Sequence, residues 1–178
     1  QIHKRSMGLM GCNFDITVVA KDKAEAQAYI DIAVDEIYRI EKLISSWKKT
    51  SQTSKINKNA GIKPVKVDAE LFNLIERSNA ISRLTDGAFD ISFAAVEKLF
   101  SFEGQVTTWP DKKIIEASVK NINHKNIILD KDAGTVFLKE KGMRIGFGAI
   151  GKGYAADKAK LLLKSKGVKA GIINASGD

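Results

Sequence analysis

Only one cysteine, Cys12, occurs among the 178 residues of this chain, and no run of apolar residues is long enough to cross a lipid bilayer. A single cysteine excludes an internal disulfide and says little about the cellular compartment. The sequence also lacks an arginine-rich arm, zinc-finger spacing and an RNA-binding signature. We therefore expect no nucleic-acid partner. The N-terminal residues do not have the pattern of a signal peptide either.

The charge balance is positive, with 29 basic against 21 acidic residues and a formal net charge of +8. Such a balance is compatible with an anionic ligand, a nucleic acid or a membrane surface. The lysines are spread over the chain, however, and Lys158, Lys160 and Lys164 fall on the polar face of an expected helix. A solvated surface is the simpler interpretation. The length and the hydrophobic fraction of 44% predict one globular domain over residues 1–178.

Hydrophobic periodicity predicts helices mixed with antiparallel hairpins, and so an α+β fold with a mixed or antiparallel sheet and packed helices. The expected strands are 14–20, 127–129, 136–139, 143–147 and 170–173, and the expected helices are 23–43, one capped by Asp68, one following Pro110 and 150–166. Segment 45–61 is polar and is expected to be a loop. His3 is expected in an irregular tail and His124 in an exposed turn. In the helix after Pro110, the side chains expected to face inward are Ile114, Ile115 and Val119.

The segment with the most chemical information is 145–157, which reads Ile-Gly-Phe-Gly-Ala-Ile-Gly-Lys-Gly-Tyr-Ala-Ala-Asp. Glycines between an apolar segment and a helix let the backbone approach a bulky anion. The first N–H groups of the helix and its dipole then favour a phosphate or pyrophosphate, to which Lys152 adds a positive charge. A tight turn packed against a neighbour explains the glycines equally well.

Two nucleotide-binding motifs fit this segment less well. Gly146, Gly148 and Gly151 satisfy the spacing of a dinucleotide-binding Rossmann motif. That motif needs an acidic residue at the end of the next strand, where this chain has Asn174. A Walker A loop needs Ser or Thr after the lysine, where this chain has Gly153. A Rossmann protein that binds NAD is therefore only a remote alternative.

Further blocks occur in a fixed order along the chain. They are Met10-Gly11-Cys12-Asn13-Phe14, Ser45-Ser46-Trp47 with Ser51, Ser54 and Asn57, Thr85-Asp86-Gly87-Ala88-Phe89-Asp90, the glycine-rich segment, and Asn174-Ala175-Ser176-Gly177-Asp178. In this order they resemble the ApbE family of FAD:protein FMN transferases, formerly called thiamine biosynthesis lipoproteins. The resemblance covers about residues 7 to 178 and only the N-terminal portion of the family's length. It implies an ApbE-like, T-fold-like domain that is incomplete at its C-terminus.

The resemblance implies an Mg²⁺-dependent transfer of FMN from FAD to a Ser or Thr hydroxyl of an acceptor flavoprotein subunit, with release of AMP. The acceptor hydroxyl attacks, so no catalytic nucleophile is expected in this chain. The family position that supplies a metal ligand is Ala149, through its backbone carbonyl, and no residue here matches the other metal ligands. We expect a missing C-terminal segment to carry them. The family also implies the periplasmic side of the membrane and a lipid anchor in the precursor.

The cofactor-binding positions implied by the resemblance are Met10, Trp47, Ala88, Phe89, Asp90, Gly146 and Lys152. From the residues alone, Trp47 could fold back to anchor its own loop, whereas the resemblance implies that this aromatic side chain stacks on the flavin ring. Met10 and Phe89 could be ordinary core residues, and Asp90 a local cap. Gly146 departs from the family pattern, since many relatives carry Asp there.

Three interpretations remain open from the sequence. The first is the transferase, and a variant of the same chemistry hydrolyses FAD to FMN and AMP with water as the acceptor. The second is a flavin-binding module without catalysis, which the missing metal ligands and Gly146 favour. The third is the Rossmann protein mentioned above.

Overall fold

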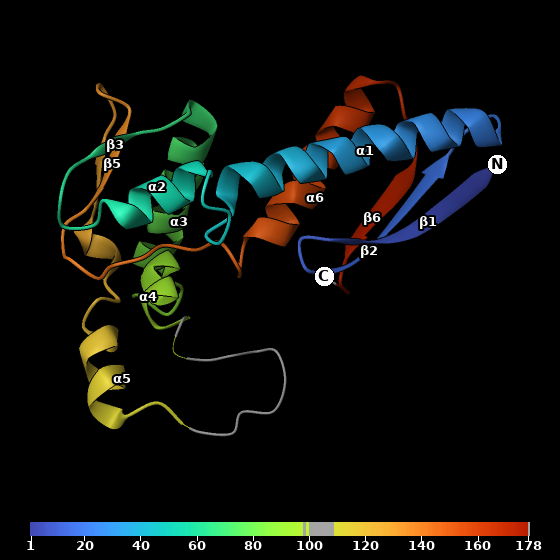
Figure 1. The fold of residues 1–178 in the computed structure, drawn as a ribbon. Helices are drawn as coiled ribbons and strands as arrows, with labels where there is room; N and C mark the ends of the chain where they lie inside the picture. Colours follow the sequence, from blue (N-terminus) through green and yellow to red (C-terminus); the bar gives the residue numbers. More distant parts are fainter. Residues whose placement is uncertain (98, 100–108, 178) are drawn as a thin grey trace. The chain divides into compact units, whose positions relative to one another are not determined.

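The computed structural model describes residues 1–97, 99 and 109–177, which form two compact units. The first unit consists of Gln1–Leu43 and Gly148–Asp178, and the second of Ile44–Phe147. Asp178, the last residue of the closing sequence block, lies outside the described residues. The single domain expected from the chain length stays a prediction. Helices and small antiparallel sheets occur in both units, as the α+β expectation requires (Figure 1).

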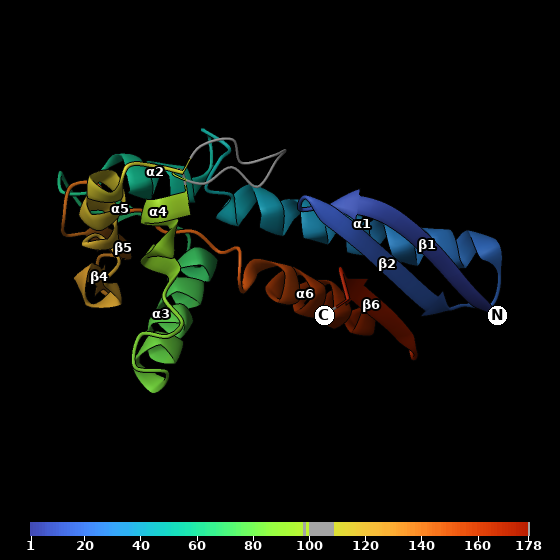
Figure 2. The same ribbon diagram turned by 90° about the horizontal axis from the view of Figure 1, so that it is seen from below.

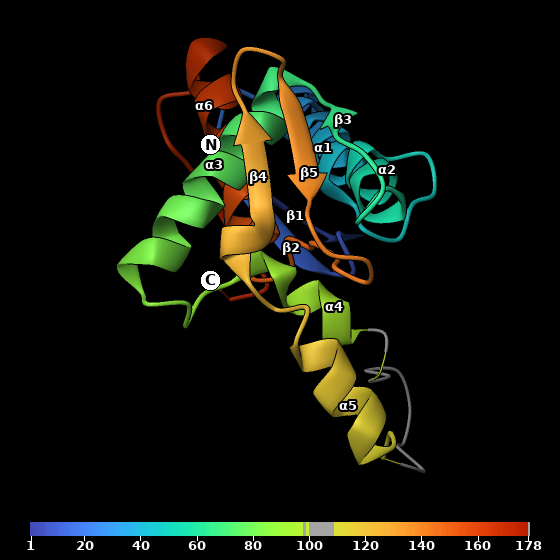
Figure 3. The same ribbon diagram turned by 90° about the vertical axis from the view of Figure 1, so that its left-hand side faces the viewer.

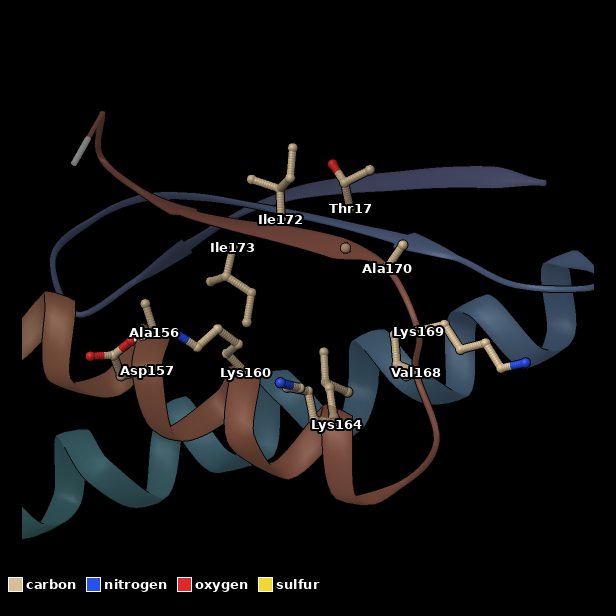
Figure 4. Close-up of a pocket in the computed structure, with 12 residues that line it drawn as sticks. Thr17, Ala156, Asp157, Lys160, Lys164, Val168, Lys169, Ala170, Ile172 and Ile173 are labelled. Carbon is tan, nitrogen blue, oxygen red and sulfur yellow. Dashed lines mark hydrogen bonds and ion pairs between the residues drawn. The ribbon is translucent and has the colours of Figure 1, made fainter.

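The first unit is a sheet of order β1-β2-β6 with two helices, α1 and α6. The bounds are β1 Ile2–Leu9, β2 Cys12–Val19, β6 Gly171–Ala175, α1 Lys23–Ile44 and α6 Gly151–Ser165. All three strands are antiparallel to their neighbours. Figure 2 shows the strands beside α1 and α6, and Figure 4 shows both helices on one side of the sheet. The unit is therefore a sheet layer packed against a helix layer.

The core of this unit follows from strict alternation along β2. Phe14, Ile16 and Val18 are fully buried, whereas the residues between them are less buried. A strand sends alternate side chains to opposite faces, so these three face the helix layer. The two helices contribute small or branched side chains to this core. They are Ala26, Ile30, Ala33, Ile37 and Ile40 from α1 and Ala155, Ala159 and Leu163 from α6.

The second unit combines short helices with a sheet of order β3-β5-β4, whose strands lie side by side in Figure 3. Its elements are α2 Gln52–Lys58, β3 Val65–Lys66, α3 Ala69–Leu84, the 3-10 helix η1 Ile91–Phe93, α4 Ala94–Glu97, α5 Lys112–Val119, the 3-10 helix η2 His124–Asn126, β4 Ile127–Asp130 and β5 Thr135–Leu138. Leu71, Leu74 and Ile75 of α3 are buried with Val136 and Leu138 of β5 in its core. The hairpin expected near residue 130 is confirmed.

Three sequence expectations about secondary structure are wrong. Segment 45–61 is not all loop, because α2 forms within it. Ser51 caps α2 by accepting a hydrogen bond from the Ser54 backbone N–H, and this polar cap is invisible to hydrophobic periodicity. His3 lies in β1, not in an irregular tail. Segment 143–147 is extended but belongs to no strand of the described sheets.

Other expectations fail in detail. α5 exposes Ile114 and Val119 by about half, so these side chains do not face inward. Asp68 precedes α3, but its carboxylate makes no capping bond and accepts a hydrogen bond from the Gln52 side chain instead. His124 is largely buried, with only 11% of its side chain exposed, because it packs beside the Asp90 carboxylate.

Candidate functional site

A groove of about 510 Å³ surrounds Trp47 in the second unit. Its lining residues are Ser46, Trp47, Lys49, Ser54, Asn57, Lys58, Glu97 and Arg144. The Trp47 ring is 63% exposed, so it does not fold back to anchor its own loop. Lys49, Lys58 and Arg144 bring three positive charges to the groove, and Glu97 brings one negative charge. An exposed aromatic ring among cations suits a flat, anionic ligand.

The serines of this segment build the wall of the groove through local hydrogen bonds. The Ser51 hydroxyl donates to the Ser45 carbonyl, and the Ser54 hydroxyl donates to the Ser46 carbonyl. The Lys48 N–H in turn donates to the Ser45 hydroxyl. These side-chain bonds satisfy backbone groups that have no helix or strand partner. They therefore hold the loop around Trp47 in one conformation without covering the ring.

Asn57 of α2 connects the groove wall to the extended segment 143–147. Its side-chain amide donates to the Ile145 carbonyl at 3.0 Å and accepts from the Ile145 N–H at 2.8 Å. Asn57 thus replaces the neighbouring strand that this segment lacks. Along the segment, Met143, Ile145 and Phe147 are buried, while Arg144 and Gly146 are half-buried. Alternation therefore places Arg144 and Gly146 on the same side, where Arg144 lines the groove.

A side chain at Gly146 would crowd its neighbours. A Cβ atom built there would lie 3.0 Å from the Ala94 Cβ, 3.6 Å from the Glu97 Oε2 and 3.8 Å from the Ser46 Oγ. The backbone N–H of Gly146 donates to the Ile91 carbonyl, which holds the segment against η1. The Glu97 carboxylate thus lies close to the place that a side chain at 146 would take. The groove keeps an acidic group here, although position 146 has none.

The Ala88-Phe89-Asp90 segment lies between α3 and η1. Ala88 is exposed and Phe89 half-buried. The Asp90 carboxylate accepts from the Ser92 N–H, the Ser92 hydroxyl and the His124 N–H, and so caps η1 and fastens the segment before β4. The local capping role is therefore observed. A contact between this segment and a cofactor stays a prediction.

In the first unit, Met10 occupies a backbone conformation that is unusual for its type. Met10 and Gly11 form the two-residue turn of the β1–β2 hairpin, with φ angles of 51° and 75°. A two-residue turn with positive φ at both positions favours Asn or Gly, and a bulky residue there loses roughly 1–2 kcal/mol. Strain that is kept at a turn is a physical reason to suspect a function. The positive φ angle of Met10 is consistent with the predicted ligand contact, which stays a prediction.

The glycine-rich turn of the same unit leads into α6 as the sequence predicts. Ala149 is exposed, the helix begins at Gly151, and no side chain caps its N-terminal end. The uncapped N–H groups of the first turn, with the half-buried Lys152 among them, form a positive end of the helix. No atom of the described chain, apart from the two chain neighbours, lies within 4 Å of the Cβ position of Gly148. Crowding therefore does not explain why this residue is glycine.

A second groove, of about 330 Å³, runs along α6 beside β6 and was not predicted. Figure 4 shows Ile173 of β6 pointing toward α6, with Lys160 and Lys164 reaching up from the helix, whereas Ile172 and Thr17 point away from it. The Lys160 ammonium pairs with the Asp157 carboxylate at 2.9 Å. The groove therefore has apolar walls and basic margins, away from the turn that contains Lys152.

The chain matches a known protein family over most of its length. The model of the ApbE family matches residues 10–178. The chain belongs to the ApbE family. It is 31% identical to an FAD:protein FMN transferase of Klebsiella pneumoniae over 178 residues, which are all of this chain and 55% of that protein. A second transferase of the same organism is 25% identical over 94% of this chain and 49% of its own length.

Solved structures agree with this assignment. The ApbE protein of Thermotoga maritima superposes with a TM-score of 0.87 at 27% identity, over 98% of this chain and 57% of that one. The flavin transferase ApbE of Vibrio cholerae has the same fold, with a TM-score of 0.89 at 17% identity. The match covers 99% of this chain and 58% of that one. The chain thus spans about half the length of the ApbE relatives it matches.

The residues that the ApbE resemblance implies fall into two groups. Trp47, Ala88, Phe89, Asp90 and Gly146 belong to the second unit, and Met10, Ala149 and Lys152 to the first. The structure brings Trp47 into one groove with three basic residues that the sequence did not single out, Lys49, Lys58 and Arg144. Glu97 was missed as well. Only Arg144 had a usable signal, since it lies two positions before Gly146 in an alternating segment.

The described residues do not form an Mg²⁺ site by themselves. Mg²⁺ takes near-octahedral oxygen ligands, usually with at least one carboxylate. Within residues 1–97, 99 and 109–177 no group of three or more His, Cys, Asp or Glu side chains could hold a metal ion. Ala149 offers only a backbone carbonyl, and the nearby Asp157 is paired with Lys160. In the same described part, no helix is both long and apolar enough to span a membrane.

Proposed function

We propose that this chain binds FAD and contributes to the transfer of its FMN moiety to an acceptor protein. The observation that carries the proposal is the exposed Trp47 ring in a basic groove of an ApbE-family chain. A flat isoalloxazine can stack on the indole face, and the cations of the groove offset the charge of the phosphates. The relatives' name, FAD:protein FMN transferase, supports the same chemistry.

In the proposed reaction, the oxygen of a Ser or Thr hydroxyl on the acceptor protein attacks the phosphorus of the FMN half of FAD. A new P–O bond joins FMN to the acceptor. The bond between that phosphorus and the bridging oxygen of the pyrophosphate breaks, and AMP leaves with the bridging oxygen and its electron pair. The hydroxyl proton is released to solvent. This chain then serves to bind and orient FAD and need not supply a nucleophile.

The family resemblance implies that Lys152 contacts the cofactor, and we infer that the uncapped N-terminal turn of α6, taken by itself, is a favourable place for a phosphate group. Backbone N–H groups at a helix N-terminus and a lysine point charge are favourable partners for this group. Magnesium dependence is part of the proposal, and when bound the ion would neutralise charge on the phosphates.

One assay separates the three chemistries that fit this chain. The 178-residue chain is incubated with FAD, Mg²⁺ and an acceptor peptide containing Ser or Thr, and the products are identified by mass and by chromatography. Peptide carrying covalent FMN together with AMP supports the transferase. Free FMN with AMP identifies a hydrolase. FAD that binds but stays intact favours the flavin-binding module, and absence of binding overturns all three.

Location is a separate part of the proposal. We infer from the family resemblance that the protein acts on the periplasmic side of the cell membrane, with a lipid anchor in its precursor. Fractionation of cells that express the natural gene, followed by detection of this chain in the periplasmic and membrane fractions, tests this inference. Recovery of the chain in the cytoplasm alone overturns it.

A further inference from the structure

The groove around Trp47 has a polar corner that the stacking proposal does not use. The corner is formed by Ser46, Glu97 and Arg144, which all line the groove. Ser46 and Glu97 approach the same point, since their Oγ and Oε2 atoms lie 3.8 and 3.6 Å from the Cβ position of Gly146. Arg144 lies two residues from Gly146 on the same side of its extended segment. These groups therefore lie close together beside the backbone of Gly146.

The polar groups of this corner have unused hydrogen-bonding capacity. Among the described residues, the Arg144 side chain has no hydrogen-bonding or ion-pair partner, and only its Nε is buried. The terminal N–H groups of its guanidinium can therefore donate to a ligand in the groove that Arg144 lines. In the described part of the chain, the Glu97 carboxylate has no hydrogen-bonding or ion-pair partner. The corner thus offers donors from Ser46 and Arg144 and an acceptor from Glu97.

This pattern complements one edge of a flavin ring. The pyrimidine edge of the isoalloxazine presents an N3–H donor between two carbonyl acceptors. An edge of this kind needs one acceptor flanked by donors, which is the set that Glu97, Arg144 and Ser46 provide. A carboxylate that accepts from the ring N–H forms a charge-assisted bond, which is stronger than a neutral one. A phosphate at the same place would instead meet the negative charge of Glu97.

We propose that Glu97 binds the N3–H of the isoalloxazine, and that Arg144 and Ser46 bind its flanking carbonyl groups. The inference rests on the proposed function, because it takes the ring to be stacked on Trp47. It makes Glu97 a specificity-determining residue: the chain selects flavins with a free N3–H. The absence of a side chain at Gly146 is what lets the Glu97 carboxylate reach this position.

The test compares riboflavin with 3-methylriboflavin, which lacks the N3–H and is otherwise the same ring. Both are titrated into the intact chain, and binding is followed by quenching of flavin fluorescence. We expect riboflavin to bind about tenfold to a hundredfold more tightly, the range for a hydrogen bond to a charged group. Glu97→Ala should weaken riboflavin binding and remove this discrimination. Glu97→Gln keeps an acceptor and should retain part of it.

The controls separate this inference from the flavin proposal. Glu76→Ala removes an exposed carboxylate on α3, outside the groove, and should keep the full discrimination. Arg144→Gln should weaken the binding of riboflavin and of 3-methylriboflavin by the same factor. Equal binding of the two flavins by the unmodified chain, or full discrimination in Glu97→Ala, overturns the role of Glu97 while the flavin proposal stands. Binding of neither flavin by the unmodified chain overturns both.

Discussion

Asn57 and Ile145 are joined by two hydrogen bonds, one in each direction between the side-chain amide and the backbone. The pair is 88 residues apart in sequence and is buried. An amide side chain has the same donor and acceptor arrangement as a peptide group, so Asn57 can satisfy the backbone as a neighbouring strand would. Through this pair, α2 holds the segment that carries Arg144 and Gly146.

We predict that Asn57→Leu destabilises the second unit strongly. The change keeps the approximate volume but leaves the N–H and C=O of Ile145 buried without partners. Each unsatisfied group is unfavourable by about 1–3 kcal/mol, so a loss of roughly 2–6 kcal/mol in the free energy of unfolding is expected. Chemical denaturation followed by circular dichroism measures it. Asn73→Leu, at an exposed position of α3, should change stability by less than about 0.5 kcal/mol. Equal stabilities of the two variants would contradict the argument.

Much of the fold was predictable because hydrophobic periodicity determines the long elements. The helix expected at 23–43 is α1, the helix expected at 150–166 is α6, and the hairpin near residue 130 is present. Periodicity fails where polar side chains take over the role of backbone partners. α2 depends on the Ser51 cap, and the extended segment 143–147 depends on Asn57. Neither interaction leaves a pattern of apolar residues in the sequence.

The candidate site was predictable in part for a related reason. Trp47 attracts attention as an aromatic residue in a polar loop, and its exposure agrees with that reasoning. Glu97 gives no local signal in the sequence. Its relevance depends on its closeness to Gly146, which belongs to a distant segment of the chain. Such a contact between distant segments becomes visible only in three dimensions. The same holds for the proximity of Asp90 to His124.

We predict that Asp15 contributes to stability at neutral pH and not in acid. Hydrogen bonds from Lys4, and then from Ser6, lower the pKa of Asp15 below its ordinary value of 3.8. A carboxyl group with a lowered pKa stabilises the fold above the unfolded-state pKa, and the contribution is lost as the pH falls through the folded-state pKa. Asp15→Asn should therefore lower the melting temperature at about pH 7, and the difference from the parent should disappear toward about pH 2.

Asp31 provides an independent example on α1. The Arg5 guanidinium, with help from Gln27, lowers the pKa of Asp31 as well. Asp31→Asn should show the same dependence on pH, with the effect present at neutral pH and absent in acid. Asp35→Asn, at an exposed position of the same helix, is the control in the melting experiments. A difference that persists unchanged in acid would show that the Asn variants act through packing and not through charge.

We predict that Trp47→Ala weakens FAD binding by roughly 1–3 kcal/mol, by analogy with the stacking of nucleic-acid bases on aromatic side chains. Trp109→Ala is a matched control, because Trp109 is the other tryptophan of the chain, is 80% exposed and does not line the Trp47 groove. Flavin fluorescence should be strongly quenched on binding to the parent and to Trp109→Ala. Equal affinity of Trp47→Ala and the parent would exclude the stacking role.

Lys152 should distinguish flavins by their phosphates. If the N-terminal turn of α6 binds the pyrophosphate, Lys152→Ala should weaken FAD binding much more than riboflavin binding, since riboflavin has no phosphate. Lys164→Ala, in the last turn of the same helix, removes an equal charge away from this turn and should affect both ligands little. Titration of both variants with both ligands provides the measurement. Identical losses for FAD and riboflavin in Lys152→Ala would show that Lys152 does not contact phosphate.

A substitution at Gly148 tests whether FAD approaches the glycine-rich turn closely, because a change in packing is not expected there. Apart from its two chain neighbours, no atom of the described chain lies within 4 Å of its Cβ position, so the first carbon of a side chain fits there without a clash in the free protein. We therefore expect Gly148→Val to keep nearly the parent's melting temperature but to weaken FAD binding, because the side chain takes the space needed by the phosphates. Gly8→Val is a matched control, since Gly8 also has no atom within 4 Å of its Cβ position. Unchanged FAD affinity in Gly148→Val would mean that the glycine turn does not face the cofactor.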